Sequence, residues 1–292
     1  MISIRLKKIK DRHGLSLAKS LAYEIYIKLY RYNPKFRTLF QLFTKTKRPK
    51  QIFFLIGAYN SGTTIIKNTI STHPDVSIAP IEGDLLTSEI SNMEEGGWHR
   101  CLYGNKDSIN KYRDEVTINP KQLLKDWSPW IKEDKYFLEK SIANSVRISQ
   151  LRKAFPGCKF INVIRAPDGV INGIKKRSKP TGDASKQLNS DTYPDELLYC
   201  QWSYIYGLIE SDSKSKDTYN CSYENFIANP ESFTKSLFKF LELEPISIKL
   251  NSNILSIGAN NLYIRPFPEN TNIVDYANTD LRVSEIKRLK CD

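Results

Sequence analysis

A polar loop between an apolar strand and an apolar helix carries the strongest chemical signal in this sequence. The run from Ile52 to Ile56 predicts a buried strand that breaks at Gly57, and residues 61–64 (Ser-Gly-Thr-Thr) open a helix with apolar residues at helical spacing. Free N–H groups in the first turn of a helix, together with the helix dipole, attract an anion, and Gly62 lets the backbone approach it closely. We therefore expect a phosphate or sulfate site here, although a plain capped helix in another α/β protein gives the same pattern. The Gly-x-x-x-x-Gly-Lys-[Ser/Thr] pattern of the ATP and GTP phosphate loop is absent.

An arginine at the end of a second apolar strand is the next candidate. Residues 159–164 predict a strand, Arg165 follows it directly, and Pro167 begins a helix. An arginine at the carboxyl end of a sheet strand lies where ligands bind in open α/β folds, and its planar guanidinium suits a phosphate. The alternative is a strand-end arginine that forms an ordinary ion pair.

Three segments, in this order, resemble the sulfotransferases that use 3′-phosphoadenosine 5′-phosphosulfate (PAPS). Residues 61–64 with His73-Pro74 resemble the 5′-phosphosulfate loop of that family, Arg165-Ala-Pro resembles its 3′-phosphate site, and residues 221–243 resemble its strand, turn and helix. The resemblance spans about residues 51–243. It implies a P-loop-like α/β fold of three layers, with a central parallel sheet flanked by helices, and PAPS as co-substrate without a metal.

The resemblance also implies a set of nucleotide-binding residues: Gly57, Asn60, Ser61, Gly62, Thr63, Thr64, Arg165, Asn172 and Gly173. Two of them depart from the family pattern. Asn60 stands where the family has a Lys or Arg that stabilises the leaving group, and an amide carries no charge. Gly173 stands where a serine is usual, and either Asn172 or the basic run of residues 175–177 is a candidate replacement.

Candidate catalytic residues lie on other segments. Residues 139–141 (Glu-Lys-Ser) resemble the Glu-Lys-[Ser/Thr]-Pro element of the glycan-type branch, which makes Lys140 the favoured cation over Lys67 of the first helix. Glu82 lies at the distance from the His-Pro turn at which the glycan and tyrosyl branches have a catalytic base, Asp84 is nearby, and His99 is the alternative base. An exposed strand-end lysine and a solvated loop carboxylate remain the plain structural interpretations.

The resemblance implies transfer of a sulfuryl group from PAPS to a hydroxyl or amine, and the glycan-like element favours a carbohydrate or glycolipid acceptor. A catalytically weak or inactive nucleotide-binding protein is the alternative, because Asn60 lacks the charge of the loop cation. An unrelated kinase-like transferase is less favoured, since the loop lysine and magnesium-holding carboxylates are missing. Residues 83–118 and 178–194 are polar, and we expect them to build the acceptor pocket, the second as a mobile loop.

The positive charge of the chain is concentrated at one end. The net charge is +12, and residues 1–50 hold 14 Lys and Arg against 2 Asp and Glu, while the remaining residues hold 30 of each sign. Apolar and aromatic residues recur through this arm at roughly helical spacing. Such an arm either lies on an anionic membrane surface or meets an acidic partner, or it packs on the domain with a solvated basic face. Nucleic acid is disfavoured because no nucleic-acid-binding motif accompanies the charge.

We expect two parts, a basic helical arm of residues 1–50 and an α/β domain of residues 51–292. The pattern predicts strands at 52–56, 75–79, 136–140, 159–164 and 218–223. It predicts helices at 63–72, 119–132, 145–155, 194–211 and 231–241, and one more that begins at residue 167.

Five scattered cysteines suggest reduced thiols, and neither a stretch of about 20 apolar residues nor a signal-peptide pattern occurs. These features favour a cytoplasmic protein, with peripheral attachment to the inner membrane face as an open alternative.

Overall fold

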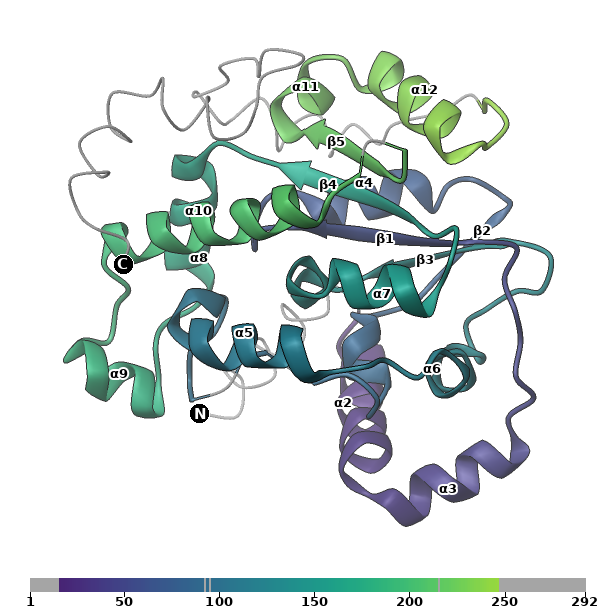
Figure 1. Ribbon diagram of the computed structural model, residues 1–292, viewed down its shortest axis with the longest axis horizontal. Coiled ribbons are helices and arrows are strands. Elements are labelled where there is room, and N and C mark those ends of the chain that lie inside the picture. Colours follow the sequence, from purple (N-terminus) through teal and green to yellow (C-terminus); the bar gives the residue numbers. More distant parts are fainter. Residues whose placement is uncertain (1–15, 92, 95, 215, 247–292) are drawn as a thin grey trace.

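Five parallel strands form the central sheet, in the order β2-β3-β1-β4-β5. The structure is a computed structural model that describes residues 16–91, 93, 94, 96–214 and 216–246. In the central strand, Leu55 pairs with Lys140 of β3 on one side and with Ile161 of β4 on the other. Because all strands run in the same direction, their carboxyl ends lie at one edge of the sheet (Figure 1).

The strands are β1 (Ile52–Gly57), β2 (Val76–Ile78), β3 (Tyr136–Lys140), β4 (Lys159–Ile164) and β5 (Thr218–Ser222). The α-helices of the described residues are α2 (Leu17–Tyr32), α3 (Pro34–Phe43), α4 (Thr63–Ile70), α5 (Lys106–Glu115), α6 (Pro120–Trp127), α7 (Ile148–Ala154), α8 (Pro167–Arg177), α9 (Gly182–Leu188), α10 (Asp195–Asp212), α11 (Tyr223–Ala228) and α12 (Pro230–Leu241). Short 3-10 helices are η1 (Gly83–Leu86), η2 (Leu102–Asn105) and η3 (Ile142–Val146).

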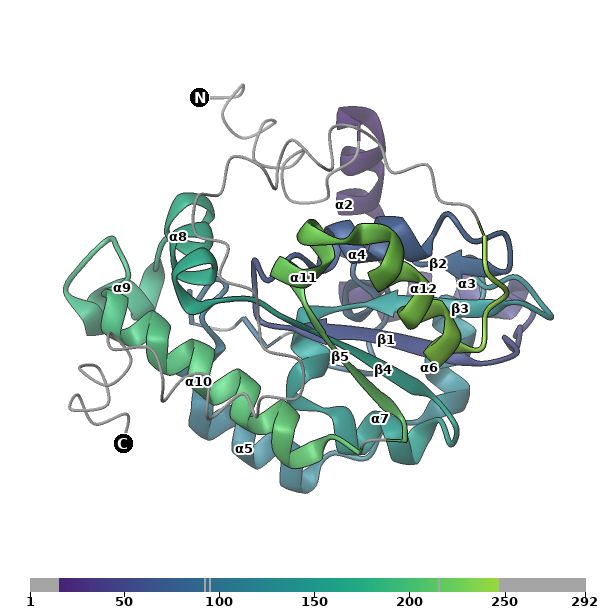
Figure 2. The same cartoon turned by 90° about the horizontal axis from the view of Figure 1, so that it is seen from above.

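Helices cover both faces of the sheet, which gives the three layers of the predicted fold class (Figure 2). On one face, α4, α11 and α12 pack in the cluster that contains Phe53 and Leu55 of β1. On the other face, α6, α7 and α10 pack in the cluster that contains Phe54 and Ile56. Since successive side chains of a strand point to opposite faces, a strand covered on both faces reads as a continuous apolar run, as the sequence predicted.

The structure confirms the five predicted strands to within one residue at each end. Asn119 caps α6 as expected, because its side chain accepts hydrogen bonds from the N–H groups of residues 121 and 122. That helix ends at Trp127, however, and not near residue 132. The helix predicted at 145–155 is divided between η3 and α7.

The prediction that residues 178–194 form a mobile loop is wrong for their central part, which is helix α9. Tertiary hydrogen bonds hold this helix against a second predicted loop: Thr181 N donates to Gly97 O (3.1 Å) and Ala184 N donates to Gly96 O (2.9 Å). Local composition could not reveal these partners, because they lie more than 80 residues earlier in the chain. The two segments assigned to the acceptor pocket therefore contact each other.

The described part of the basic arm packs on the domain. Tyr30 is fully buried, and its hydroxyl donates to the Asp126 carboxylate of α6 (2.6 Å). Arg31 donates to the carbonyl oxygens of Asp84, Thr87 and Ile90. Residues 1–15 of the arm and 247–292 of the predicted domain lie outside the described residues.

Among the described residues, no helix combines the length and the apolar character that a membrane-spanning segment needs.

Cys101, Cys158 and Cys221 are free and buried, in agreement with the expected reduced thiols. Cys200 is disulfide-bonded, so the expectation is wrong for that residue.

Candidate functional site

The predicted nucleotide residues lie at the carboxyl edge of the sheet, where the strand order reverses. The chain leaves β1 through α4 toward β2 on one side, and it leaves β4 through α8 toward β5 on the other. Open α/β sheets bind their ligands in the crevice between two such connections. The loop after β1 and Arg165 after β4 flank this point.

Two glycines allow the loop after β1 to close tightly. Gly57 has φ of 145°, and a Cβ there would lie 2.6 Å from the carbonyl oxygen of Val163. Ser145 of η3 fastens the same residue, because its Oγ accepts from Gly57 N (2.9 Å) and donates to Gly57 O (2.9 Å). Gly62, the residue before α4, has φ of 98°, and a Cβ there would lie 2.2 Å from the Tyr223 ring. The loop therefore depends on glycine for both its conformation and its space.

Arg165 reaches back to this loop. Its Nη1 donates to the carbonyl oxygen of Asn60 (2.9 Å), and its guanidinium lies over the Tyr223 ring, 4.4 Å from the centroid. Gly169 makes room for the side chain, since a Cβ there would lie 2.5 Å from Nε. Trp202 Nε1 donates to the Arg165 carbonyl (2.9 Å). The structure thus brings together two segments, about a hundred residues apart, that the sequence proposed as one site.

Asn60 leaves a buried donor free at the loop. Its Nδ2, like the hydroxyl of Ser61, is buried and has no hydrogen-bond partner within the described part of the chain. A buried polar group without a partner is costly, and an anionic ligand would satisfy both donors. A Cβ at Gly173 would lie 2.8 Å from Asn60 Cβ, so the serine that is usual at that position would collide with Asn60. Because a lysine or arginine at position 60 would carry the same Cβ, the close approach of α8 to the loop requires glycine at position 173 whichever residue stands at position 60.

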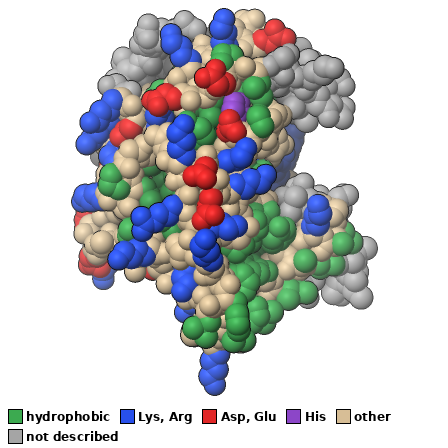
Figure 3. All heavy atoms as spheres, turned by 90° about the vertical axis from the view of Figure 1, so that its right-hand side faces the viewer, with side chains coloured by type: hydrophobic (Ala, Val, Ile, Leu, Met, Phe, Trp, Pro, Cys, Tyr) green, Lys and Arg blue, Asp and Glu red, His purple; other side chains and the backbone are tan. Residues whose placement is uncertain are grey.

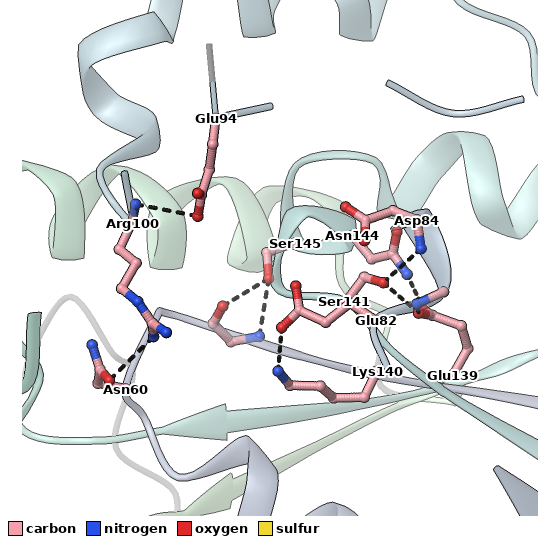
Figure 4. A network of polar contacts seen from close by, with 12 residues as sticks. Asn60, Glu82, Asp84, Glu94, Arg100, Glu139, Lys140, Ser141, Asn144 and Ser145 are labelled. Atoms are coloured by element: carbon pink, nitrogen blue, oxygen red, sulfur yellow. Dashed lines mark hydrogen bonds and ion pairs between the residues drawn. The ribbon is translucent and has the colours of Figure 1, made fainter. Parts of the chain in front are cut away.

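Arg100 brings to the loop a positive charge that the sequence analysis missed. Its Nη1 donates to Asn60 Oδ1 (3.4 Å; Figure 4). Its Cζ lies 5.7 Å from the centroid of the Tyr59 ring. The backbone N–H donates to Glu94 Oε1 (3.2 Å), and φ is 61°, in the left-handed region. Such backbone strain in a residue other than glycine gathers at functional sites. No local spacing signal joins residues 60 and 100, so the sequence alone could not identify the pair.

A second group of charges lies at the end of β3. Glu82 and Lys140 form an ion pair, with 30% of the Glu82 side chain and 14% of the Lys140 side chain exposed (Figure 4). Lys67 of α4 is electrostatically coupled to this pair, since burial and then the charge of Lys140 lower the pKa of Lys67. Lys67 therefore adds positive charge to the surroundings of this pair.

Glu139 anchors the turn that carries Glu82. This fully buried carboxylate accepts from Gly83 N (2.8 Å), from the Ser141 hydroxyl and from Asn144 Nδ2. Burial raises the pKa of Glu139 to about 7, although the hydrogen bond from Ser141 opposes the shift. Burial, followed by the charge of Glu82, also raises the pKa of the neighbouring Asp84 to about 6. Of the three carboxylates, Glu82 is the one that remains accessible.

His99 belongs to the first predicted acceptor segment and contacts the second. Its Nε2 is 3.0 Å from Thr181 Oγ1, and its Nδ1 is 3.6 Å from Glu94 Oε2. Burial alone would raise the pKa of Glu94, but hydrogen bonds, chiefly with His99 and Tyr59, lower it. The contact of Nε2 with Thr181 therefore joins the two segments, whereas Nδ1 faces a carboxylate of its own segment.

The remaining predicted residues differ in accessibility. Thr63 is buried, whereas Thr64 is exposed in the first turn of α4. Asn172 is exposed on α8, next to Gly173. No group of three or more His, Cys, Asp or Glu side chains within the described ranges is arranged to hold a metal ion.

A family model described as "Sulfotransferase family" matches residues 52–247, which is more than half of the chain. The chain therefore belongs to the sulfotransferase family. Among curated proteins, a "Putative protein-tyrosine sulfotransferase" of Caenorhabditis briggsae is 22% identical over 206 residues. The match covers 67% of this chain and 66% of that protein, slightly less than two thirds of its length.

Solved sulfotransferase structures show distant likeness. A sulfotransferase from Alicyclobacillus acidocaldarius has a TM-score of 0.44 and 14% identity, and the match covers 73% of this chain and 92% of that one. The sulfotransferase STF9 from Mycobacterium avium has a TM-score of 0.47 and 13% identity, covering 90% of this chain and 80% of that one. The family assignment rests on the sequence model alone.

Proposed function

We propose that this sulfotransferase moves a sulfuryl group from PAPS to a hydroxyl or amine of a carbohydrate or glycolipid. The observation that carries the proposal is the hydrogen bond from Arg165 to the Asn60 carbonyl, which joins the two expected phosphate-binding segments at the point where the strand order reverses. The buried free donors of Asn60 and Ser61 fit an anionic donor molecule at the same loop.

Glu82 is the proposed base. Of the three neighbouring carboxylates it is the accessible one, because Glu139 and Asp84 are buried. The acceptor oxygen attacks sulfur and forms the new S–O bond while Glu82 takes the acceptor proton. The bond from sulfur to the bridging phosphate oxygen breaks, and its electron pair remains on the nucleotide. Lys140, which lies against Glu82, is a cation that can stabilise the charge that develops.

We further propose that Arg100 replaces the charge that Asn60 lacks. Its guanidinium donates to the Asn60 side chain, so its charge lies beside the residue that stands in place of the usual loop cation. With Arg100, Lys140 and Lys67 near the loop and the end of β3, the site retains positive charge without a basic residue at position 60. This argues for an active enzyme over a nucleotide-binding protein without activity.

The carbohydrate acceptor rests on the resemblance of residues 139–141 to the glycan-type element. A tyrosine side chain is the second candidate, since the curated relative is described as a protein-tyrosine sulfotransferase. The contact between α9 and residues 96–97 supports an acceptor region built from both predicted segments. A panel of glycan, glycolipid and tyrosyl-peptide acceptors with labelled PAPS would distinguish the two classes.

The donor site is tested by thermal-shift titration with 3′,5′-bisphosphoadenosine, 5′-AMP and ATP with magnesium. At about 100 times the dissociation constant, the bound ligand adds about 2.7 kcal/mol to the free energy of unfolding. We expect a shift for the bisphosphate that Arg165→Ala abolishes and that Lys153→Ala, which changes an exposed lysine at the end of α7, leaves intact. A preference for ATP with magnesium, or no response to any of the three, would rule out the donor.

The role of Arg100 is tested by a double-mutant cycle with Asn60. Loss of one charged donor at a developing negative charge typically lowers kcat by roughly 100-fold or more. We expect that loss in Arg100→Ala, partial recovery when Asn60→Lys is added, and little gain from Asn60→Lys alone. Unchanged kcat in Arg100→Ala, with a gain from Asn60→Lys alone, would show that the loop cation is missing.

A further inference from the structure

The large apolar side chains that the described residues expose all lie on α2 and α3. They are Ile25, Leu29, Tyr32, Leu39, Leu42 and Phe43. Leu42 is 74% exposed and Phe43 is 84% exposed, so both are almost as accessible as in an unfolded chain. In Figure 3, hydrophobic side chains gather at the lower end of the molecule, where α3 lies, with Lys and Arg side chains beside them. Contiguous apolar surface of this kind marks an interaction site.

The opposite side of this helical pair already has a partner. Tyr26 and Tyr30 stack on each other, and Phe40 meets both rings edge-to-face. The Tyr26 ring also packs edge-to-face against Trp130, at 5.7 Å between centroids. The Asp126 carboxylate of α6 accepts from the buried Tyr30 hydroxyl. The domain therefore holds the two helices with their remaining apolar side chains directed outward.

The charge around this apolar face is positive. Residues 17–50 contain nine Lys and Arg and a single acidic residue, Glu24. Just beyond the end of α3, a hollow of about 310 Å³ is lined by the cationic side chains of Arg48, Lys121 and Lys125, and none of the described residues that line it is acidic. Lys47 N donates to Ser128 Oγ (2.8 Å) and fixes the chain beside this hollow.

We propose that the outer face of α2 and α3, with the adjoining basic hollow, docks on an anionic lipid bilayer. Apolar side chains that enter the acyl boundary, together with Lys and Arg near the headgroups, are the two attractions that hold amphipathic helices at a membrane surface. A second copy of the chain fits this face poorly, because it would bring two strongly basic surfaces together. The proposal is independent of the donor and the acceptor, since none of these side chains belongs to the proposed catalytic site.

The test is flotation of the full chain with vesicles of phosphatidylcholine alone or with added phosphatidylglycerol. We expect binding only to the anionic vesicles, with weaker binding at high salt. The double substitution Leu42→Ser/Phe43→Ser should weaken binding at least about tenfold, because it removes the apolar anchor. Lys121→Gln/Lys125→Gln should weaken it by about fivefold for each charge.

The matched control is Lys235→Gln/Lys239→Gln, which removes two exposed charges from α12. This variant should bind like the original protein, and a thermal melt checks that each variant is folded. Equal binding to neutral and anionic vesicles, binding to neither, or equal losses in the control would overturn the proposal. So would self-association that Leu42→Ser/Phe43→Ser abolishes, since it would assign the face to a second copy of the chain.

Discussion

The substitution Glu139→Gln tests how the carboxylate network at the end of β3 responds to pH. Glu139 is fully buried, and burial raises its pKa from the ordinary 4.5 to about 7. A carboxyl group whose pKa is raised by folding contributes stability that is fully present below 4.5. That stability is lost as the pH rises to about 7, because the folded state must then hold an unfavourable buried charge. At about 1.4 kcal/mol for each unit, the loss is about 3 kcal/mol.

A glutamine side chain at this position fits the same network. The Oδ1 of Asn144 is buried without a hydrogen-bond partner in the part of the chain that the structure describes, whereas its Nδ2 faces Glu139. If the Asn144 amide turns over, its oxygen can accept from the amide that the substitution introduces, while Gly83 N still has an acceptor. The variant therefore keeps the hydrogen bonds and loses the titrating group.

The assay is urea-induced unfolding at pH 5 and at pH 8. The free energy of unfolding should fall between these values by about 3 kcal/mol less in Glu139→Gln than in the original protein. A smaller fall remains in the variant, because Asp84, with a pKa of about 6, titrates in the same interval. Glu133→Gln, which changes a half-exposed carboxylate, should leave the pH dependence unchanged. The reasoning fails if Glu139→Gln keeps the full pH dependence of the original protein.

Two further predictions concern the loop and the arm. Gly62→Ala should destabilise the fold and reduce nucleotide affinity at least about tenfold, because the new methyl group would meet the Tyr223 ring. Gly157→Ala is the control, since Gly157 has φ of 83° but no atom of the described residues lies within 4 Å of the added Cβ. Thermal melts and binding titrations of the two variants separate the collision from backbone strain, and equal losses would contradict the prediction. Tyr30→Phe should lower the free energy of unfolding by about 1.5–3 kcal/mol, because it removes the buried hydrogen bond to the Asp126 carboxylate. Urea unfolding measures this loss, and a change below about 0.5 kcal/mol would mean that the contact does not anchor the arm.

Local signals in the sequence determined most of the fold. The strands β1 and β4 could be predicted because a strand that is buried on both faces has a continuous apolar sequence. The start of α6 could be predicted from Asn119-Pro120. The polar loop after β1 and Arg165 after β4 were also identified, since each is defined by the strand that it follows. Periodicity and capping depend only on residues that are close together in the chain, so both can be recognised in the sequence.

Tertiary packing alone decided how these segments meet. The sequence identified Asn60 and Gly173 as separate departures, and only the structure shows that the two residues lie against each other. We propose a role for Arg100 only because the fold brings its guanidinium to Asn60. In the same way, helix α9 lies where the composition predicted a loop. Contacts between residues distant in the chain arise from the packing of whole elements around a common sheet. No local pattern records which side chains that packing will bring within hydrogen-bond distance.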